Sequence, residues 1–105
     1  MSKLVAPHGG GNLKSLLVPE VERVAELERA KGLKQVVMTS RETSDVLMFA
    51  MAAYTPLDGF MGEADWKGVC GNMKLTNGLF WPIPITLSTT NEIADSITDG
   101  EEVAL

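Results

Sequence analysis

Apolar residues recur at helical spacing between Pro19 and Gly32, and charged residues occupy most positions between them. An apolar stripe opposite a charged face is typical of an amphipathic helix at the surface of a domain. Proline is tolerated in the first turn of a helix, and glycine commonly follows the last turn. The pattern therefore predicts a helix from Pro19 to Lys31. Its apolar stripe consists of Val21, Val24, Ala25 and Leu27.

Residues 35–38 form a short apolar run after this helix, which predicts a buried strand. Thr39 and Glu42 have the spacing of a capping box, and they begin a second helix that we expect to reach about Ala53. From Val46 to Ala53 this helix is apolar on every side, which indicates that it is buried or faces another domain. Two methionines in it are interpreted as core residues. They are Met48 and Met51.

Two shorter helices are expected further along the chain. Residues 63–70 predict one that ends at Gly71, with Trp66 and Val69 sharing its inner face. Thr89 and Glu92 repeat the capping-box spacing and predict another. The inward side chains of this last helix are expected to be Ile93, Ala94 and Ile97.

Asn77 and Gly78 lie between two apolar runs, and this pair predicts a β-hairpin with a type I′ turn. Apolar residues alternate along the strand that follows, from Leu79 to Leu87, and predict one buried face. Pro82 and Pro84 fall between them and remove two backbone donors on one side, so we expect this strand to be paired on the other side only.

Two further segments have a weaker strand pattern. Residues 13–18 are largely apolar and predict a short strand or a docking segment. Residues 101–105 alternate in polarity and predict a strand with Val103 and Leu105 facing inward. Because the sequence stops within this pattern, we expect the chain to be part of a longer protein.

Composition and charge narrow the classes of function. The chain has 105 residues, of which 45% are hydrophobic, and this suits one domain with a packed core. The formal net charge of −5 argues against nucleic acid or an anionic membrane surface as a partner. Cys70 is the single cysteine, so it is interpreted as a buried, unreactive thiol in a cytoplasmic protein. We expect neither a signal peptide at residues 1–13 nor a membrane span.

Few residues have the chemistry of a catalytic or metal site. His8 is the only histidine, so no pair of histidines can form within the chain. It lies in a glycine-rich segment, residues 1–13, that we interpret as a flexible lead-in with a turn. Asp58, Glu63 and Asp65 lie close together in sequence, but their spacing matches no calcium loop, and Asp58 is interpreted as a cap of its own turn. We therefore assign no catalytic, cofactor-binding or metal-binding residue.

Three segments resemble those of a known family. They are LVAPHGG at residues 4–10, YTPLDGFMGEADW at residues 54–66 and FWPIPITL at residues 80–87. The chain resembles the amino-terminal domain of the ATP sulfurylase (sulfate adenylyltransferase) family, in which segments of the form SPLxGFM and WPxPxTL follow one another at about this distance. The resemblance runs in order from Leu4 to Leu105. Thr55 stands where the family commonly has serine.

The resemblance implies an α+β fold of the PUA-like class, a pseudo-barrel of mixed strands with three or four short helices packed outside. Residues 1–105 would be the amino-terminal domain, and the catalytic domain would lie outside this chain. In the family, sulfate attacks the α-phosphorus of MgATP and yields adenosine 5′-phosphosulfate and pyrophosphate. A glutamine-x-arginine-asparagine-proline segment and a pair of histidines do this work, and neither occurs here. The implied partners are the catalytic domain of the same polypeptide and further copies of the protein.

Two alternatives remain open on the sequence alone. PUA-like folds often bind RNA, although the net charge of −5 and the lack of a lysine–arginine cluster count against RNA as a partner. The other alternative is a free-standing interaction protein that docks through the apolar helix at residues 46–53.

Overall fold

A computed structural model describes residues 5–105, and these residues form four helices and two short strands. Leu4, the first residue of the LVAPHGG segment, lies outside the described residues. The expected α+β class is confirmed. In chain order the elements are α1 (Glu20–Lys31), β1 (Lys34–Gln35), α2 (Ser40–Ala50), α3 (Glu63–Asn72), α4 (Asn91–Ser96) and β2 (Val103–Ala104).

The two strands form a parallel pair in which Lys34 lies opposite Val103 and Gln35 opposite Ala104. The pairing continues beyond β1, because the N–H of Val36 donates to the carbonyl of Ala104 (2.8 Å). β1 is thus shorter than the run predicted at residues 35–38. Within residues 5–105 the sheet has only these two strands and does not close into a barrel.

The inward side of β2 differs from the expectation. Ala104 is buried, whereas Leu105 is 50% exposed. The prediction that Val103 and Leu105 both face inward is therefore wrong. The physical reason is that α1 packs against β2, and residues of α1 share a groove with the side chain of Ala104.

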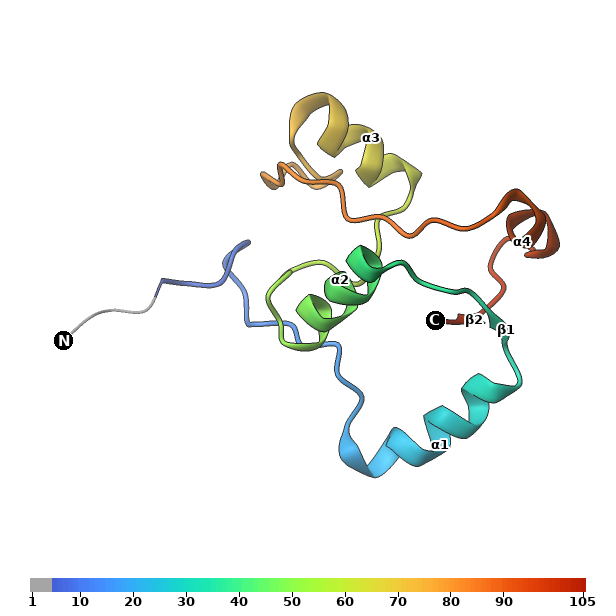
Figure 1. Cartoon of the computed structure of the whole chain (residues 1–105). Helices are drawn as coiled ribbons and strands as arrows, with labels where there is room; N and C mark the ends of the chain where they lie inside the picture. The colour runs from blue at the N-terminus through green and yellow to red at the C-terminus, as the bar shows by residue number, and fades with distance from the viewer. Residues whose placement is uncertain (1–4) are drawn as a thin grey trace.

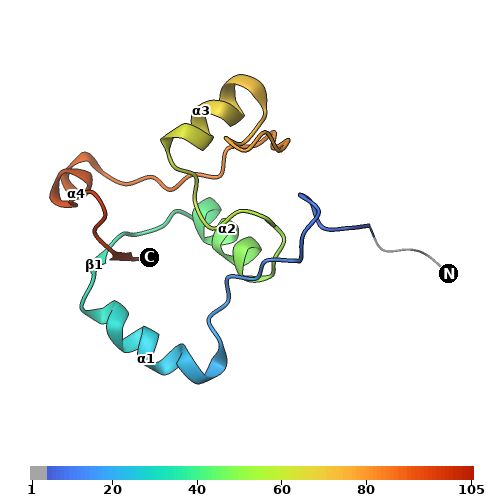
Figure 2. The ribbon, with the colours of Figure 1, turned by 180° about the vertical axis from the view of Figure 1, so that it is seen from behind.

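α1 has the predicted ends but buries none of its residues. Its apolar stripe is left open, with Val21 94%, Val24 73% and Leu27 61% exposed. In Figures 1 and 2 the chain runs as an open ring from α1 through β1 to α2, with the carboxyl terminus inside it. The radius of gyration is 15.7 Å, whereas a compact domain of this length has about 13 Å.

The core lies in the other half of the molecule, between α2, α3 and the segments that follow each of them (Figure 1). The ring of Phe49 contacts those of Tyr54 and Phe60 edge to face, at centroid distances of 5.3 and 5.4 Å. This geometry is favourable for aromatic rings, and it fixes the turn after α2 against the helix. The buried apolar residues of this core are Phe49, Leu57, Val69, Leu75 and Ile85.

α2 is shorter and less covered than predicted. It ends at Ala50, and turns occupy residues 51–56, where Ala52 has a positive φ of 65°. Leu47 and Met51 are 60% and 65% exposed, so burial on every side is wrong and Met51 is not a core residue. The helix packs on the core through Phe49, whereas Leu47 and Met51 lie on a side that stays exposed in the described residues.

The two later helices are present, but α4 buries none of its residues, and Ala94, which was predicted to face inward, is exposed. α3 extends to Asn72 and ends where Met73 adopts a left-handed conformation (φ 55°). Val69 is buried as predicted, but Trp66 is 44% exposed and is not its partner in the core. α4 begins one residue later than expected, because Thr90 rather than Thr89 accepts the cap hydrogen bond from Ile93 N–H (3.3 Å).

The hairpin forms, with a different turn. The N–H of Gly78 donates to the carbonyl of Leu75 (2.9 Å), and the N–H of Leu75 donates to the carbonyl of Leu79 (2.9 Å). Gly78 has a positive φ of 87°, whereas Asn77 does not. This is a three-residue loop that ends in a left-handed glycine, instead of the predicted type I′ turn.

The paired part of the hairpin is also short. Lys74 and Phe80 form a single antiparallel bridge, and Trp81 N–H donates to the carbonyl of Met73 (2.8 Å). After Trp81 the chain is extended without a ladder, because Pro82 and Pro84 cannot donate backbone hydrogen bonds. The predicted alternation holds for Ile85, which is buried, but not for Ile83, which is 61% exposed.

We predict that Gly78→Val lowers the free energy of unfolding by about 1 kcal/mol or more, because a β-branched residue resists positive φ. Nothing lies within 4 Å of a Cβ built at Gly78, so the effect isolates backbone strain from steric overlap. Denaturant titration measures it. The control is Thr76→Val, at an exposed loop position without positive φ. Equal stabilities of the two variants would contradict the positive φ assigned to Gly78 in this turn.

Candidate functional site

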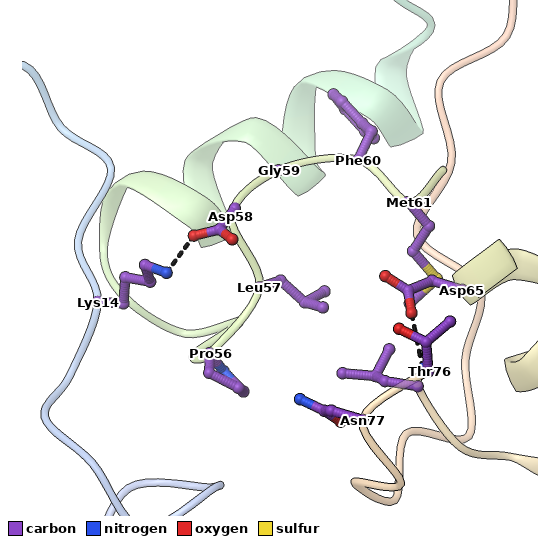
Figure 3. A pocket seen from close by; sticks show the side chains of 11 residues that line it. Lys14, Pro56, Leu57, Asp58, Gly59, Phe60, Met61, Asp65, Thr76 and Asn77 are labelled. Carbon is purple, nitrogen blue, oxygen red and sulfur yellow. Dashed lines mark hydrogen bonds and ion pairs between the residues drawn. The ribbon is translucent and has the colours of Figure 1, made fainter. Parts of the chain in front are cut away.

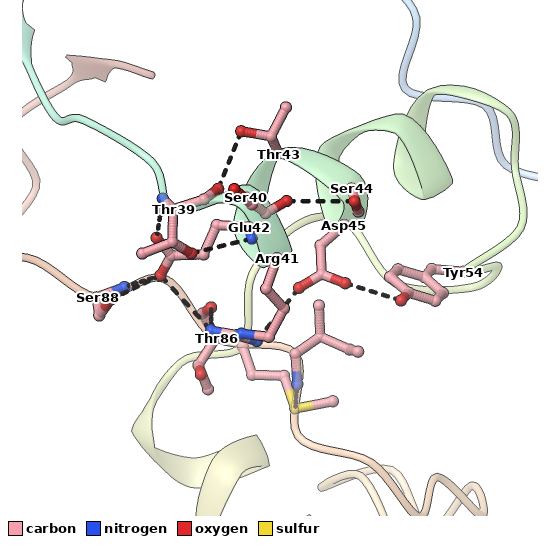
Figure 4. A network of polar contacts seen from close by, with 12 residues as sticks. Thr39, Ser40, Arg41, Glu42, Thr43, Ser44, Asp45, Tyr54, Thr86 and Ser88 are labelled. Carbon is pink, nitrogen blue, oxygen red and sulfur yellow. Dashed lines mark hydrogen bonds and ion pairs between the residues drawn. The ribbon is translucent and has the colours of Figure 1, made fainter.

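The carboxylate of Glu42 is completely buried at the start of α2. The capping box predicted from the sequence is present, because Thr39 N–H donates to Glu42 Oε1 (2.9 Å) and Glu42 N–H donates to Thr39 Oγ1 (3.2 Å). The second oxygen, Oε2, accepts from the N–H (2.5 Å) and the hydroxyl (2.8 Å) of Ser88 (Figure 4). One carboxylate therefore joins a helix start to a segment 46 residues later in the chain.

A second polar connection lies one turn further along α2. Arg41 pairs with Asp45 (3.3 Å) and also donates to the carbonyl of Thr86 (3.2 Å). Asp45 in turn accepts from the hydroxyl of Tyr54 (2.8 Å), as Figure 4 shows. Every buried polar side-chain atom in the described part of the chain has a hydrogen-bond partner. The network thus holds the residue 86–88 segment and the turn at Tyr54 against the same helix.

These contacts determine the acid–base properties of the network. Hydrogen bonds from Thr39 N–H and from Ser88 lower the pKa of Glu42 from 4.5 to about 2. Burial and the hydrogen bond to Asp45 raise the pKa of Tyr54. A carboxylate that is ionised and saturated with donors at neutral pH is poorly suited to proton transfer. We interpret the network as structural.

The three segments that carried the family resemblance meet on one side of the hairpin. The Nε2–H of His8 donates to the carbonyl of Phe80 (2.7 Å), and its ring lies 5.8 Å from that of Trp81. Tyr54 contacts Trp81 edge to face at 6.0 Å. The glycine-rich segment is therefore docked on the hairpin through His8, and the predicted turn forms at His8 and Gly9.

Gly9 and Thr55 contribute to holding the glycine-rich segment in this position. Gly9 has a positive φ of 89°, and a Cβ there would lie 3.4 Å from both Leu79 and Pro56, so a larger residue would be strained and tightly packed. Thr55 is buried, accepts from Lys14 N–H (2.9 Å) and donates to the carbonyl of Ala52 (2.7 Å). A serine at this position would carry the same hydroxyl and could make the same two hydrogen bonds.

A shallow apolar hollow of about 320 Å³ lies at this junction. Phe80 and Ile83 on its rim are 54% and 61% exposed. Such a hollow suits an apolar side chain of a partner better than a charged substrate. Its lining includes His8, Tyr54, Phe80, Trp81, Pro82 and Ile83.

Each of the three carboxylates considered as a cation site interacts with a different partner. Asp58 pairs with Lys14, so its interpretation as a cap of its own turn is wrong (Figure 3). Asp65 accepts from Thr76 N–H (2.8 Å), and Glu63 pairs with Lys67 (2.8 Å). Within residues 5–105 no group of three His, Cys, Asp or Glu side chains is placed to hold a metal ion. The three carboxylates therefore do not converge on one point, as the ligands of a single cation would.

Cys70 was interpreted as a buried thiol from the sequence, but it is exposed at the end of α3. The interpretation as a buried thiol failed because residues 63–72 bury only Val69. None of the helices in the described ranges is long and apolar enough to cross a membrane.

Comparison with protein-family models gives a match to the model described as a PUA-like domain, over residues 5–105. The chain belongs to the PUA-like family. The PUA-like class expected from the resemblance is thereby confirmed, although the closed pseudo-barrel is not seen in the described residues.

Curated relatives contain a similar sequence as part of a longer protein. The chain is 59% identical over 105 residues to the sulfate adenylyltransferase of Thiobacillus denitrificans, covering all of this chain and 25% of that protein. It is 59% identical over 106 residues to the sulfate adenylyltransferase of Syntrophobacter fumaroxidans, covering all of this chain and 26% of that protein. The chain thus spans about a quarter of the length of the relatives it matches. The resemblance to this family is confirmed.

A solved structure shares the arrangement of the chain. It is described as a hexameric APS kinase from Thiobacillus denitrificans, with a TM-score of 0.79 and 36% sequence identity. The match covers 93% of this chain and 20% of that one. In this comparison too, the described elements correspond to a small part of a longer polypeptide.

We predict that Glu42→Gln reduces the stability of the chain most at neutral pH. The folded-state pKa of Glu42 is lowered, so its stabilisation is present above pH 4.5 and is lost as pH falls from 4.5 to about 2. The stability difference between wild type and variant should shrink over that interval, as measured by thermal unfolding at each pH.

Glu20→Gln is the matched control, because Glu20 is an exposed carboxylate in the first turn of α1. A difference between wild type and Glu42→Gln that stays constant from pH 7 to 2 would contradict the assigned role of Glu42.

Proposed function

We propose that this chain is the amino-terminal, non-catalytic domain of a sulfate adenylyltransferase, and that it supports the catalytic domain of the same polypeptide. The observation that carries this proposal is the 59% identity over the whole chain to about a quarter of two such enzymes. Catalysis then belongs to the other three quarters. That enzyme class joins ATP and sulfate to form adenosine 5′-phosphosulfate and pyrophosphate.

The chemistry of the reaction supports this division of labour. A transferring phosphoryl group needs cations and hydrogen-bond donors placed around its developing charge. In the described residues, Lys14 pairs with Asp58 and Arg41 pairs with Asp45, so these cations are held by carboxylates of the chain itself. MgATP is proposed to bind to residues outside this chain.

We extend the proposal to the fold and the assembly. Further strands from the remaining part of the longer protein would complete the pseudo-barrel beside the parallel pair β1–β2. The protein is proposed to act as a homo-oligomer in the cytoplasm. A hexameric state in the structurally similar APS kinase supports self-assembly, and an unpaired cysteine supports a reducing compartment.

The proposal predicts that the longer protein releases pyrophosphate from ATP only when sulfate is present, whereas residues 1–105 alone do not. Pyrophosphate detection with and without sulfate measures both. Sulfate-dependent release by the isolated chain would contradict the assignment of catalysis to the other part.

A variant of the longer protein at His8 tests whether catalysis is confined to the part outside this chain. General acid–base groups contribute about 10²–10⁴ to a rate. His8, the only imidazole of the chain, donates to Phe80 instead of facing a charged group. His8→Ala should therefore change kcat by less than about tenfold. A loss of a hundredfold or more in a folded variant would assign His8 to the catalytic machinery.

A further inference from the structure

The tip of the hairpin is a loop of three exposed residues, Thr76, Asn77 and Gly78. Gly78 has a positive φ of 87°, and nothing lies within 4 Å of a Cβ built on it. Water therefore reaches the side-chain amide of Asn77, and the backbone nitrogen of Gly78 has no side chain beside it. Asn77 is the only one of the four asparagines in the sequence that precedes a glycine.

The side chain of Asn77 is folded back over the loop. Its Oδ1 accepts from the N–H of Leu79 (3.0 Å), two residues along the chain. Such a hydrogen bond closes a small ring, and this ring contains both the side-chain carbon Cγ of Asn77 and the backbone nitrogen of Gly78. The bond also draws electron density away from Cγ, as the donors of an oxyanion hole do. The loop thus favours attack on Cγ by the nitrogen of Gly78.

One hydrogen bond opposes this attack. The N–H of Gly78 donates to the carbonyl of Leu75 (2.9 Å), and this bond must open before the nitrogen can act as a nucleophile. It lies at an exposed loop tip, where local opening costs little free energy. The folded loop therefore slows the attack relative to an unfolded chain and leaves it accessible.

We propose that Asn77 is a site of spontaneous deamidation, with water as the only co-reactant. The nitrogen of Gly78 loses its proton and bonds to Cγ of Asn77, the bond from Cγ to Nδ2 breaks, and Nδ2 takes up a proton and leaves as ammonia. The product is a cyclic succinimide. Water then opens either of its carbonyls, which leaves aspartate or isoaspartate in the chain. No oxidation or reduction is involved, and the inference does not depend on the reaction of the longer protein.

The isoaspartate product disrupts the hairpin. In isoaspartate the main chain runs through the former side-chain carbonyl, which adds one carbon atom to the backbone of the loop. The N–H of Leu75 donates to the carbonyl of Leu79 across this loop (2.9 Å), so the longer backbone shifts the pairing out of register. The new negative charge also lies at a pocket that Asn77 shares with Asp58 and Asp65, where it adds like-charge repulsion (Figure 3).

The first test uses the other asparagines of the chain as controls. Asn12, Asn72 and Asn91 are also exposed, but they precede leucine, methionine and glutamate. The longer protein is aged at mildly alkaline pH and digested, and its peptides are weighed by mass spectrometry. The peptide with Asn77 should gain about 1 Da at a rate about tenfold or more above that of the other three, because glycine leaves the attacking nitrogen unhindered. A rate no higher than theirs would overturn the proposal.

The second test separates Asn77 from two other pairs that can close the same ring. These pairs are Asp58-Gly59 and Asp99-Gly100. An isoaspartyl methyltransferase with labelled S-adenosylmethionine measures the isoaspartate in aged wild type and in aged Asn77→Gln. The label should fall severalfold in Asn77→Gln, because glutamine must close a larger ring and does so more slowly. Equal labelling of the two proteins would place the isoaspartate at an aspartate and refute the assignment to Asn77.

Hydrogen exchange tests the consequence for the hairpin. The amide of Leu75 should exchange faster in the aged wild type than in the fresh protein, because its bond to Leu79 is lost in the isoaspartate form. Ageing should leave the same amide unchanged in Asn77→Gln. Equal protection of Leu75 in fresh and aged wild type that carries isoaspartate would show that the modification does not open the hairpin.

Discussion

The buried carboxylate of Glu42 is the constraint on which the arrangement of the chain depends. It satisfies the first turn of α2 through Thr39 and also accepts two hydrogen bonds from Ser88. A buried charge without partners is very costly, so the chain must bring Ser88 to the helix whenever Glu42 is buried. The segment before Ser88 carries Ile85 and the hairpin, and its position against the core follows from this contact.

The molecule divides into a half that is packed by its own residues and a half that is open. In the packed half, Phe49 gathers Tyr54 and Phe60, and the docked His8 closes the hairpin side. In the open half, α1 and the parallel strands surround a groove that they do not fill. Exposed apolar side chains occur in both halves, at Val24 and Leu27 in the open half and at Phe80 and Ile83 in the packed half.

Local features of the sequence predicted local structure well. The capping box of Thr39 and Glu42 involves neighbours three residues apart, and it formed as expected. The hairpin also formed around Gly78, although the turn type differed, because the pair Asn77-Gly78 is compatible with more than one loop. The resemblance to the family could be recognised from the sequence, because its three segments are long and unusual in composition.

Features set by tertiary contacts could not be read from the chain. Trp66 and Cys70 were expected inside because apolar residues are usually buried, but α3 covers the core through Val69 alone. The partners of Glu42 and Asp58 lie 46 and 44 residues away, at Ser88 and Lys14, and no local spacing indicates either pair. The face of β2 was likewise decided by α1, which lies more than 70 residues earlier.

A double-mutant cycle between Glu42 and Ser88 measures whether the carboxylate of Glu42 holds the start of α2 and the segment at Ser88 together. Glu42→Gln and Ser88→Ala are made singly and together, and the free energy of unfolding is measured at pH 7 by denaturant titration. If one carboxylate holds the two segments together, the double variant loses clearly less stability than the sum of the single losses. Additive losses within about 0.3–0.5 kcal/mol would show that the two residues are independent and that the carboxylate does not couple the two segments.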